Sequence, residues 1–291
     1  MSKTSKRETK PCPFCGQSAQ RRFGLRHAMV FECSKTNCRL RFAHPQLKKA
    51  QLEAAYRKFY YPEQDNGQPV SYESTPKEIL QQFFARAAAE FGGLAGRRIL
   101  DFGCGIGTLC HIARDLAMRP TGIEPDCCAR SKARESGLFA VYPSLVDLLA
   151  TEPDARFDFI VLWEVIEHLR EPWRDLELLA GVLRPGGWLL GSTPNAASLR
   201  ARLLRSHWEN CINPTHFYYF TQTSMNAALR RARFHRPSLW SFPIEYPGHG
   251  LVRRALNRFL VATRSNGQLF FAANAPLPNP ELARRNNDEE P

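Results

Sequence analysis

The chain has 291 residues, of which 43% are hydrophobic and 23% charged, a composition typical of a globular protein. It contains no run of about 18 apolar residues, and its polar, basic start, MSKTSKRETK, lacks the apolar stretch of a secretory signal, so the sequence favours a cytoplasmic protein. The net charge of +12 is unevenly placed: residues 1–60 carry 14 Lys or Arg against three Asp or Glu, and the remainder carries 26 against 25. Such a basic segment favours phosphate-bearing partners such as nucleic acid, although it equally keeps a small domain soluble.

Four of the nine cysteines lie in this basic N-terminal segment. Cys12 and Cys15 belong to PCPFCG and Cys33 and Cys38 to FECSKTNC, with the hairpin-like stretch RRFGLRHAMVF between them. In a cytosolic chain, C-x2-C followed by C-x4-C is typical of a structural zinc site in which four thiolates surround the ion. We therefore predict a zinc-ribbon-like module over residues 1–46. A degenerate ribbon with free thiols is the alternative.

A helix and a linker are expected over residues 47–75. The segment 45–60 has the pattern of an amphipathic helix, and residues 61–74 are rich in turn formers. The sequence TPKE, which begins at Thr75, has the form of a capping box and predicts the start of the next helix, with the proline in its first position.

Strand-like and helix-like runs alternate over residues 76–275. This alternation predicts an α/β fold, a Rossmann-like, mostly parallel sheet with helices on both faces. The expected strands are Arg98–Phe102, Thr121–Glu124, Phe157–Leu162, Trp188–Ser192 and the segment GQLFFAANAP, and the expected helices are Thr108–Ala117, Cys127–Glu135, Trp173–Leu183 and Thr223–Ala232. The basic amphipathic segment Leu251–Arg264 is interpreted as a lid or packing helix, with a membrane-surface helix as the alternative. The polar tail, residues 276–291, is predicted to be disordered.

A glycine-rich loop follows the first of these strands. In ILDFGCGIG, Gly103, Gly105 and Gly107 stand between a buried strand and a helix, and Asp101 precedes them. Glycines at alternate positions let the backbone turn sharply and let a ligand approach main-chain amides. Asp101 is placed to anchor the loop or to meet the ammonium group of a ligand. Glu124 ends the next strand, where an acidic side chain can accept hydrogen bonds from ribose hydroxyls.

Together with two later motifs, this pattern resembles the class I S-adenosylmethionine-dependent methyltransferases. Their first motif is D-x-G-x-G-x-G, and their second strand ends in an acidic residue. The stretches FDFIVLWEVIEHL and LRPGGWLLGSTPN look like their fourth motif and the turn into their fifth strand, and the resemblance covers roughly residues 76–275. It implies S-adenosylmethionine as the cofactor, with Gly103 and Gly105 at its methionine end and Glu124 at its ribose.

Titratable residues gather just after the fourth predicted strand. WEVIEHL contains Glu164, Glu167 and His168, which would share one face of a helical turn. The E-x-x-E-H string is similar to that of ubiquinone-pathway O-methyltransferases and small-RNA 2′-O-methyltransferases, which use it to hold a divalent cation. The resemblance to the RNA enzymes adds His216, in NPTHFYYFT, as a further ligand. A hard cation such as Mg²⁺ would polarise an acceptor hydroxyl. Without a metal, His168 is the candidate general base, and the two glutamates line the pocket.

These motifs predict an enzyme that methylates an oxygen of a small molecule, such as a saccharide or a phenol-like acceptor. Trp208, Tyr218 and Tyr219, near His216, are candidates for lining the acceptor pocket. Two alternatives are RNA ribose 2′-O-methylation and a nucleic-acid-binding regulatory protein built on an inactive scaffold. The sequence lacks the interleaved aromatic and basic residues of an RNA-stacking surface, so the small-molecule reading comes first.

Overall fold

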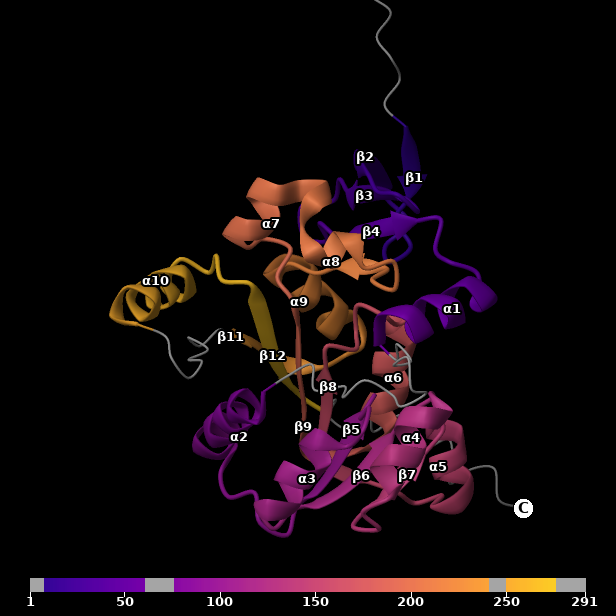
Figure 1. Ribbon diagram of the computed structural model, residues 1–291, viewed down its shortest axis with the longest axis vertical. Helices are drawn as coiled ribbons and strands as arrows, with labels where there is room; N and C mark the ends of the chain where they lie inside the picture. Colours follow the sequence, from indigo (N-terminus) through magenta and orange to yellow (C-terminus); the bar gives the residue numbers. More distant parts are fainter. Residues whose placement is uncertain (1–7, 61–75, 241–249, 276–291) are drawn as a thin grey trace, which may run out of the picture.

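The computed structural model of the protein describes residues 8–60, 76–240 and 250–275, and its centre is a seven-stranded sheet (Figure 1). The strands of this sheet are β5 (Arg98–Phe102), β6 (Arg119–Ile123), β7 (Ala140–Tyr142), β8 (Phe157–Trp163), β9 (Leu183–Pro194), β11 (His235–Trp240) and β12 (Gln268–Asn274). Their order is β11-β12-β9-β8-β5-β6-β7. Strands β5 to β9 run parallel, and β12 is antiparallel to both β9 and β11. The predicted α/β fold with a mostly parallel sheet is confirmed.

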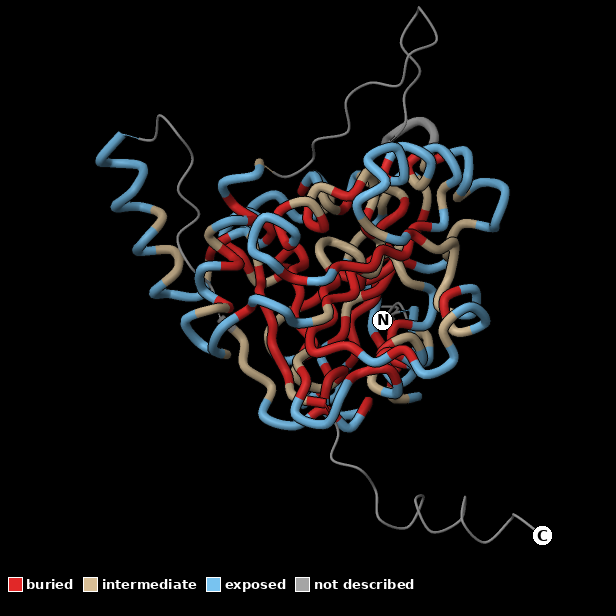
Figure 2. Tube along the Cα trace, turned by 90° about the horizontal axis from the view of Figure 1, so that it is seen from below, coloured by how far each residue is buried: buried red, intermediate tan, exposed pale blue. Residues whose placement is uncertain are grey.

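Helices cover both faces of the sheet. They are α2 (Lys77–Phe91), α3 (Thr108–Asp115), α4 (Cys127–Arg134), α5 (Leu145–Thr151), α6 (Pro172–Val182) and α9 (Gln222–Arg231). Neighbouring residues of β12 point to opposite faces: Phe270 belongs to the core cluster that includes residues of α2 and α3, and Phe271 to the cluster that includes residues of α6 and α9. Because both faces are covered, the central strands are buried along their length (Figure 2).

The strands of this sheet and the helices that cover it have the predicted type. The observed and predicted bounds differ mainly at the ends of the elements. β9 begins at Leu183 instead of Trp188, since Leu183 already pairs with Phe157 of β8. The helix expected from Pro45 begins at Lys49 (α1, Lys49–Tyr60).

Helix α2 begins at Lys77, with Pro76 at the N-cap and no side-chain cap. Thr75, the predicted capping residue, lies outside the described residues, as do the predicted linker over residues 61–74 and the predicted disordered tail.

The N-terminal module is an antiparallel sheet that borrows a strand from the distant part of the chain. Its strands are β1 (Thr9–Pro11), β2 (Ser18–Gly24), β3 (Met29–Cys33), β4 (Arg41–His44) and, from between β9 and α9, β10 (Tyr218–Tyr219). β4 pairs with β10, so that Phe42 lies opposite Tyr218. Phe14 and Phe31 of the module belong to the same core cluster as Leu176 of α6. The predicted ribbon therefore packs as part of the main core.

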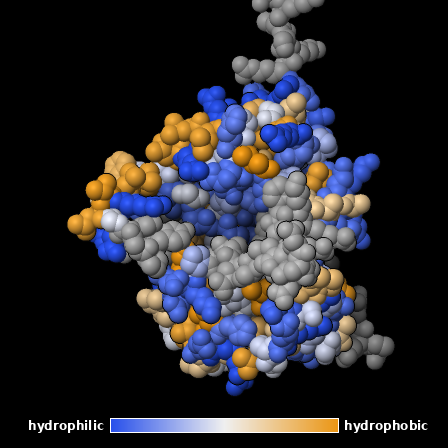
Figure 3. Space-filling view, in the orientation of Figure 1, coloured by the Kyte–Doolittle hydropathy of each residue, from blue (hydrophilic) through white to orange (hydrophobic). Residues whose placement is uncertain are grey.

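Two exposed helical segments complete the fold. The insertion between β9 and β10 contains α7 (Leu199–Leu204), a short 3-10 helix (Arg205–His207) and α8 (Glu209–Ile212), and α10 (Leu251–Ala262) lies between β11 and β12. α10 buries none of its residues, which is unlike a packing helix, and apolar side chains gather on the surface over α7 and α10 (Figure 3). Among the helices in the described ranges, none combines the length and the apolar character that crossing a bilayer requires.

Candidate active site

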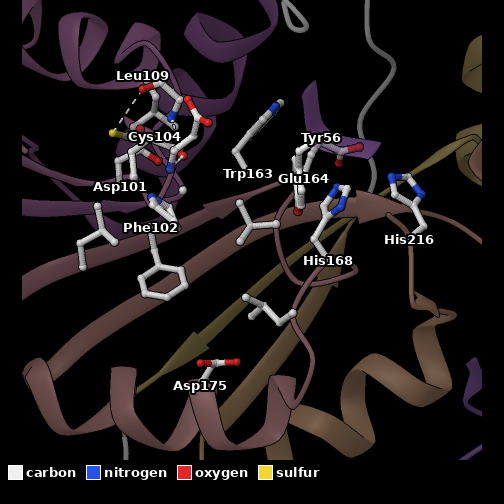
Figure 4. A pocket seen from close by; sticks show the side chains of 18 of the residues that line it. Tyr56, Asp101, Phe102, Cys104, Leu109, Trp163, Glu164, His168, Asp175 and His216 are labelled. Atoms are coloured by element: carbon white, nitrogen blue, oxygen red, sulfur yellow. Dashed lines mark hydrogen bonds between the residues drawn. The ribbon is translucent and has the colours of Figure 1, made fainter. Parts of the chain in front are cut away.

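A cavity of about 1390 Å³ opens at the carboxyl ends of the parallel strands. It is lined by the loops after β5, β6 and β8 and by residues of α1. The sheet order reverses between β5 and β8, which is where open α/β sheets bind their ligands. Asp101 and Cys104 lie at one end of the cavity and His168 and His216 at the other (Figure 4). Its volume exceeds the roughly 300–1,000 Å³ of a typical ligand pocket, so it has room for a cofactor and an acceptor together.

The three glycines of the loop after β5 have different tasks. Their φ angles are 86° at Gly103, 54° at Gly105 and 87° at Gly107. A Cβ atom at Gly103 would lie 2.6 Å from Val165, and one at Gly107 would lie 2.7 Å from the Phe139 ring, so packing requires glycine at both positions. A Cβ at Gly105 would meet no atom within 4 Å, and Gly105 lines the cavity. Gly105 is therefore the glycine that leaves room for a ligand.

Glu124 joins the glycine loop to the end of β6. One carboxylate oxygen accepts a hydrogen bond from the Gly105 amide (2.9 Å) and the other from the Asp126 amide (2.8 Å). Burial raises the pKa of Glu124, while the two amides act in the opposite direction. The carboxylate is thus held at the cavity wall, within reach of a ligand seated on the loop.

Asp101, at the end of β5, is almost wholly buried beneath this loop. The Cys110 thiol donates a hydrogen bond to its carboxylate over 3.7 Å. Burial raises the pKa of Asp101 to about 7. A cationic group that bound above it would favour the ionised form.

Glu167, His168 and His216 form a compact cluster at the opposite end of the cavity. Each offers one ligand atom, and these atoms lie within 4.8 Å of one another. The two imidazole rings are 4.5 Å apart between centroids and nearly perpendicular (Figure 4). The Phe217 amide donates to the Glu167 carbonyl (2.9 Å), which fastens the segment that carries His216 beside the turn after β8. The structure thus brings together three residues from two distant parts of the sequence.

The hydrogen bonds of this cluster leave two of its buried polar atoms without a partner among the described residues. Glu167 accepts from the Thr193 hydroxyl (3.0 Å) with one oxygen, whereas its other oxygen and the Nδ1 atom of His216 are buried and have no partner in the part of the chain that the structure describes. His168 Nδ1 lies 3.1 Å from the Thr215 carbonyl oxygen, which can only accept, so the proton is on Nδ1 and Nε2 carries the lone pair. These donor atoms fit a divalent cation, because carboxylate oxygens and neutral imidazoles are common metal ligands.

Burial controls the charge of the same three side chains. It lowers the pKa of His168 to about 4 and that of His216 well below its usual range, and it raises the pKa of Glu167 far above its usual range. Both imidazoles are therefore neutral at pH 7, the form that binds metals or accepts a proton.

Glu164 lies apart from this cluster, contrary to the prediction. The segment after β8 is a turn instead of a helix, and Glu164 has a φ of 54°, so the expected helical spacing does not apply. Its carboxylate accepts hydrogen bonds from the Ser192 hydroxyl (3.0 Å) and from the Gln268 amide. It lines the middle of the cavity, and burial raises its pKa to about 7. The structure assigns Glu164 to the cavity wall between the glycine loop and His168.

Two cavity residues have no motif in the sequence. Tyr56 of α1 places its ring 6.0 Å from that of His168, and Gln268 reaches the cavity from the start of β12. No spacing rule connects either residue to the glycine loop or to the E-x-x-E-H string. The hydrophobic pattern predicted α1 as a helix without indicating that one of its faces lines the site.

The aromatic residues expected in the acceptor pocket are core residues. Trp208, Tyr218 and Tyr219 are buried and do not line the cavity. Tyr218 and Tyr219 form β10, whose pairing with β4 directs them into the interface with the N-terminal sheet.

The four N-terminal cysteines come together as the sequence predicts. The Sγ atoms of Cys12 and Cys38 are 3.9 Å apart, those of Cys15 and Cys33 are 3.5 Å apart, and all four lie within 4.8 Å of one another. None of them forms a disulfide.

Fold and cavity together define an α/β protein with a ligand-sized cavity at the switch point of its sheet, and comparison with known proteins identifies the family. A family model described as a methyltransferase domain matches residues 72–235. This match covers more than half of the chain, which therefore belongs to the methyltransferase domain family. The predicted relation to class I S-adenosylmethionine-dependent methyltransferases is confirmed.

Individual relatives agree with this family. The ubiquinone biosynthesis O-methyltransferase of Bradyrhizobium sp. (strain ORS 278) is 33% identical over 115 residues, which cover 38% of this chain and 46% of the relative. That of Bordetella avium (strain 197N) is 36% identical over 109 residues, 36% of this chain and 45% of the relative. The chain thus spans under half the length of these curated relatives. A SAM-dependent methyltransferase from Archaeoglobus fulgidus shares the fold, with a TM-score of 0.50 and 18% identity over 78% of this chain and 100% of that one.

Proposed function

We propose that the protein transfers the methyl group of S-adenosylmethionine to a hydroxyl oxygen of a small molecule. The observation that carries this proposal is the continuous cavity, which has the glycine loop and Glu124 at one end and the Glu167, His168 and His216 cluster at the other. A cofactor on the loop and an acceptor at the cluster would meet beside Glu164. The relatives named as O-methyltransferases support oxygen as the acceptor atom.

The cofactor end has suitable groups for S-adenosylmethionine. Gly105 leaves space over its backbone, and Glu124 presents a carboxylate for the ribose hydroxyls. Asp101, buried under the loop, is placed to attract the positively charged methionine part. Asp101 lies near the end of β5, Gly105 lies in the loop after it, and Glu124 follows the adjacent strand β6, so the sheet itself sets their spacing.

The methyl transfer requires positioning and one proton acceptor. The acceptor oxygen attacks the methyl carbon, the carbon–sulfur bond breaks, and the sulfonium becomes a neutral thioether. Without a metal, the hydroxyl proton passes to the Nε2 lone pair of His168; with a cation bound by that lone pair, it passes to water. Because the sulfonium already activates the methyl group, holding the two reactants in line supplies much of the rate.

The cluster also suits a divalent cation of the Mg²⁺ type. A cation held by Glu167, His168 and His216 would polarise the acceptor hydroxyl and lower its pKa. Glu167 would bind it through the oxygen that lacks a partner within the described residues, and His216 through Nδ1.

RNA ribose methylation is the second candidate, because the N-terminal module is strongly basic. Three of its arginines, however, share one buried carboxylate, which offsets one of their charges. Arg22, Arg39 and Arg41 all lie within 3.2 Å of the Glu32 carboxylate. Binding to RNA would weaken steeply as salt is added, whereas turnover of a neutral small acceptor would not.

The first prediction tests cofactor binding at one end of the cavity and methyl transfer and metal binding at the other. Calorimetry should show S-adenosylmethionine binding that Glu124→Ala weakens by at least about tenfold, because the ribose contact is lost. Methyl transfer from labelled cofactor to a panel of phenols and saccharides should fall by at least about 100-fold in Glu167→Gln and His216→Gln. Both variants should lose Mn²⁺ binding, measured by electron paramagnetic resonance, while the control Glu164→Gln should retain it. Absent cofactor binding would reject the proposed function, and unchanged turnover in Glu167→Gln would reject the metal.

A further inference from the structure

We propose that Cys12, Cys15, Cys33 and Cys38 bind one zinc ion, and that this ion holds in place the strand that positions His216 in the acceptor site. The N-terminal module would then be a structural component of the acceptor half of the cavity. The second part of this inference rests on the proposed function, and the first part does not.

The distances between the sulfur atoms match a tetrahedral zinc site. With Zn–S bonds of about 2.3 Å, the edges of the tetrahedron are about 3.8 Å long. Two of the sulfur pairs measure 3.5 and 3.9 Å, and all pairs fall within 4.8 Å. Three of the four cysteines are buried, so the site is closed, as structural zinc sites are.

Backbone hydrogen bonds shape the two cysteine turns. The Gly16 amide donates to the Cys12 carbonyl (2.8 Å), and the Cys38 amide donates to the Lys35 carbonyl (2.9 Å). The basic surroundings of the module oppose the negative charge that four thiolates would place around one Zn²⁺. Without the ion, no covalent or metal cross-link would join the two cysteine turns of this small sheet.

An aromatic path leads from the cysteine turn to β10. Phe14 lies between Cys12 and Cys15 in the sequence, and its ring is 6.0 Å from that of Trp173 in α6. The Trp173 ring in turn is 6.1 Å from that of Tyr218. Arg231 of α9 fastens this path, since its guanidinium donates to the Phe14 carbonyl and lies over the rings of both Phe14 and Trp173.

A backbone path reaches the same strand from the other cysteines. Cys33 donates its amide to the Leu40 carbonyl (2.9 Å), at the start of β4, and β4 pairs with β10. The Ala43 amide donates to the Phe217 carbonyl (2.9 Å). Phe217 directly follows His216 and is bonded on its other side to Glu167. The residue that completes the acceptor cluster is therefore held between the N-terminal sheet and the turn after β8.

The zinc site is tested on the full chain. Mass spectrometry of the purified protein should find about one zinc per chain, and Co²⁺ in its place should give the thiolate charge-transfer band and the visible absorption of a tetrahedral site. Cys12→Ser and Cys38→Ser should bind less than about a fifth of this zinc, whereas Cys128→Ser, at an exposed cysteine outside the cluster, should bind as much as wild type. Wild-type protein with no zinc and no cobalt spectrum would overturn the site, even if it binds S-adenosylmethionine.

The link to His216 is tested by hydrogen exchange. Removing zinc with a chelator should raise exchange in the peptide 213–221 by at least about tenfold and leave β5 protected. Arg231→Ala, which keeps all four cysteines, should also raise exchange in that peptide without loss of zinc. S-adenosylmethionine affinity should change by less than about twofold in both cases. Exchange that is unchanged in 213–221, or that rises equally in β5, would overturn the link. Loss of cofactor binding in the zinc-loaded wild type would instead count against the proposed function alone.

Discussion

Single residues in the loop after β5 separate ligand contact from packing. Gly105 faces the cavity with no atom near its missing Cβ, whereas Gly103 has Val165 2.6 Å from that position. Sequence inspection treats the two as equivalent, since both belong to the same motif. In the structure they differ, because a side chain at Gly103 would enter the core beside Val165, whereas one at Gly105 would enter open space.

We predict that two matched substitutions in this loop act on different properties, one mainly on cofactor affinity and the other on stability. Gly105→Val places a β-branched residue at a φ of 54°, which costs about 1–3 kcal/mol of stability. The variant should stay folded and lower S-adenosylmethionine affinity by at least about 100-fold, because the side chain occupies space at the proposed cofactor end. Gly103→Val should lower the free energy of unfolding by about 3 kcal/mol through its clash with Val165. Calorimetry and urea unfolding distinguish the two. Tight cofactor binding by Gly105→Val would contradict the placement of the cofactor.

Asp101 makes the stability of the folded protein depend on pH. Its folded-state pKa of about 7 lies above the unfolded value of about 4. The folded protein therefore binds this proton more tightly, and stability falls as the pH rises from about 4 to about 7. Asp101→Asn should remove this effect and raise the melting temperature of the ligand-free protein by about 5 °C at pH 8, with the difference vanishing near pH 4. Scanning calorimetry across this range checks it, and a melting-temperature difference independent of pH would contradict it.

At the scale of elements, the strands are closely packed on both faces and the helices are more tolerant. A Cβ at Gly191 in β9 would lie 2.3 Å from the Phe271 ring and 2.6 Å from the Leu162 carbonyl oxygen. A Cβ at Gly181 in α6 would meet nothing within 4 Å. Replacing glycine by alanine therefore compares the packing of a strand with that of a helix that covers the same sheet.

We expect Gly191→Ala to destabilise the protein by about 3 kcal/mol, because backbone and ring must both shift. Gly181→Ala should stabilise it by about 0.5–1 kcal/mol, since alanine loses less entropy than glycine on entering a helix. Urea denaturation followed by circular dichroism measures both changes. Equal effects at the two positions would contradict the packing described for β9.

At the scale of the whole molecule, the N-terminal sheet and the methyltransferase sheet share one core. Phe14 and Phe31 from the N-terminal sheet pack in the same cluster as Leu176 and Phe271. Strand β10 hydrogen-bonds into the N-terminal sheet although it is far from it in sequence. The proposed acceptor end of the cavity depends on this junction, since His216 lies two residues before β10.

We therefore predict that the full chain unfolds in a single thermal transition. Its calorimetric and van't Hoff enthalpies should agree, because one core cluster contains residues of both sheets. Phe14→Ala should shift this one transition downward, by about 3 kcal/mol in stability, instead of creating a second one. Two separate transitions in the wild type would show that the sheets fold independently.

Local sequence determined much of this protein. Apolar runs bounded by turn residues predict β5 and β8, since strands covered on both faces must be apolar throughout. The glycines after Asp101 and the acid at Glu124 predict a ligand site at one end of the cavity, because they follow adjacent strands whose carboxyl ends meet at one edge. The spacing of the four cysteines likewise predicts their cluster.

Only the tertiary structure decided which residues meet at the opposite end, where we propose that the acceptor binds. Glu164 leaves the predicted cluster because one left-handed backbone angle turns it toward Ser192, and neighbouring letters in a sequence do not encode that angle. Tyr56 and His216 reach the cavity from segments more than 150 residues apart in the chain. Their meeting depends on the pairing of β4 with β10 and on packing between sheets, and no local pattern specifies contacts over such a separation.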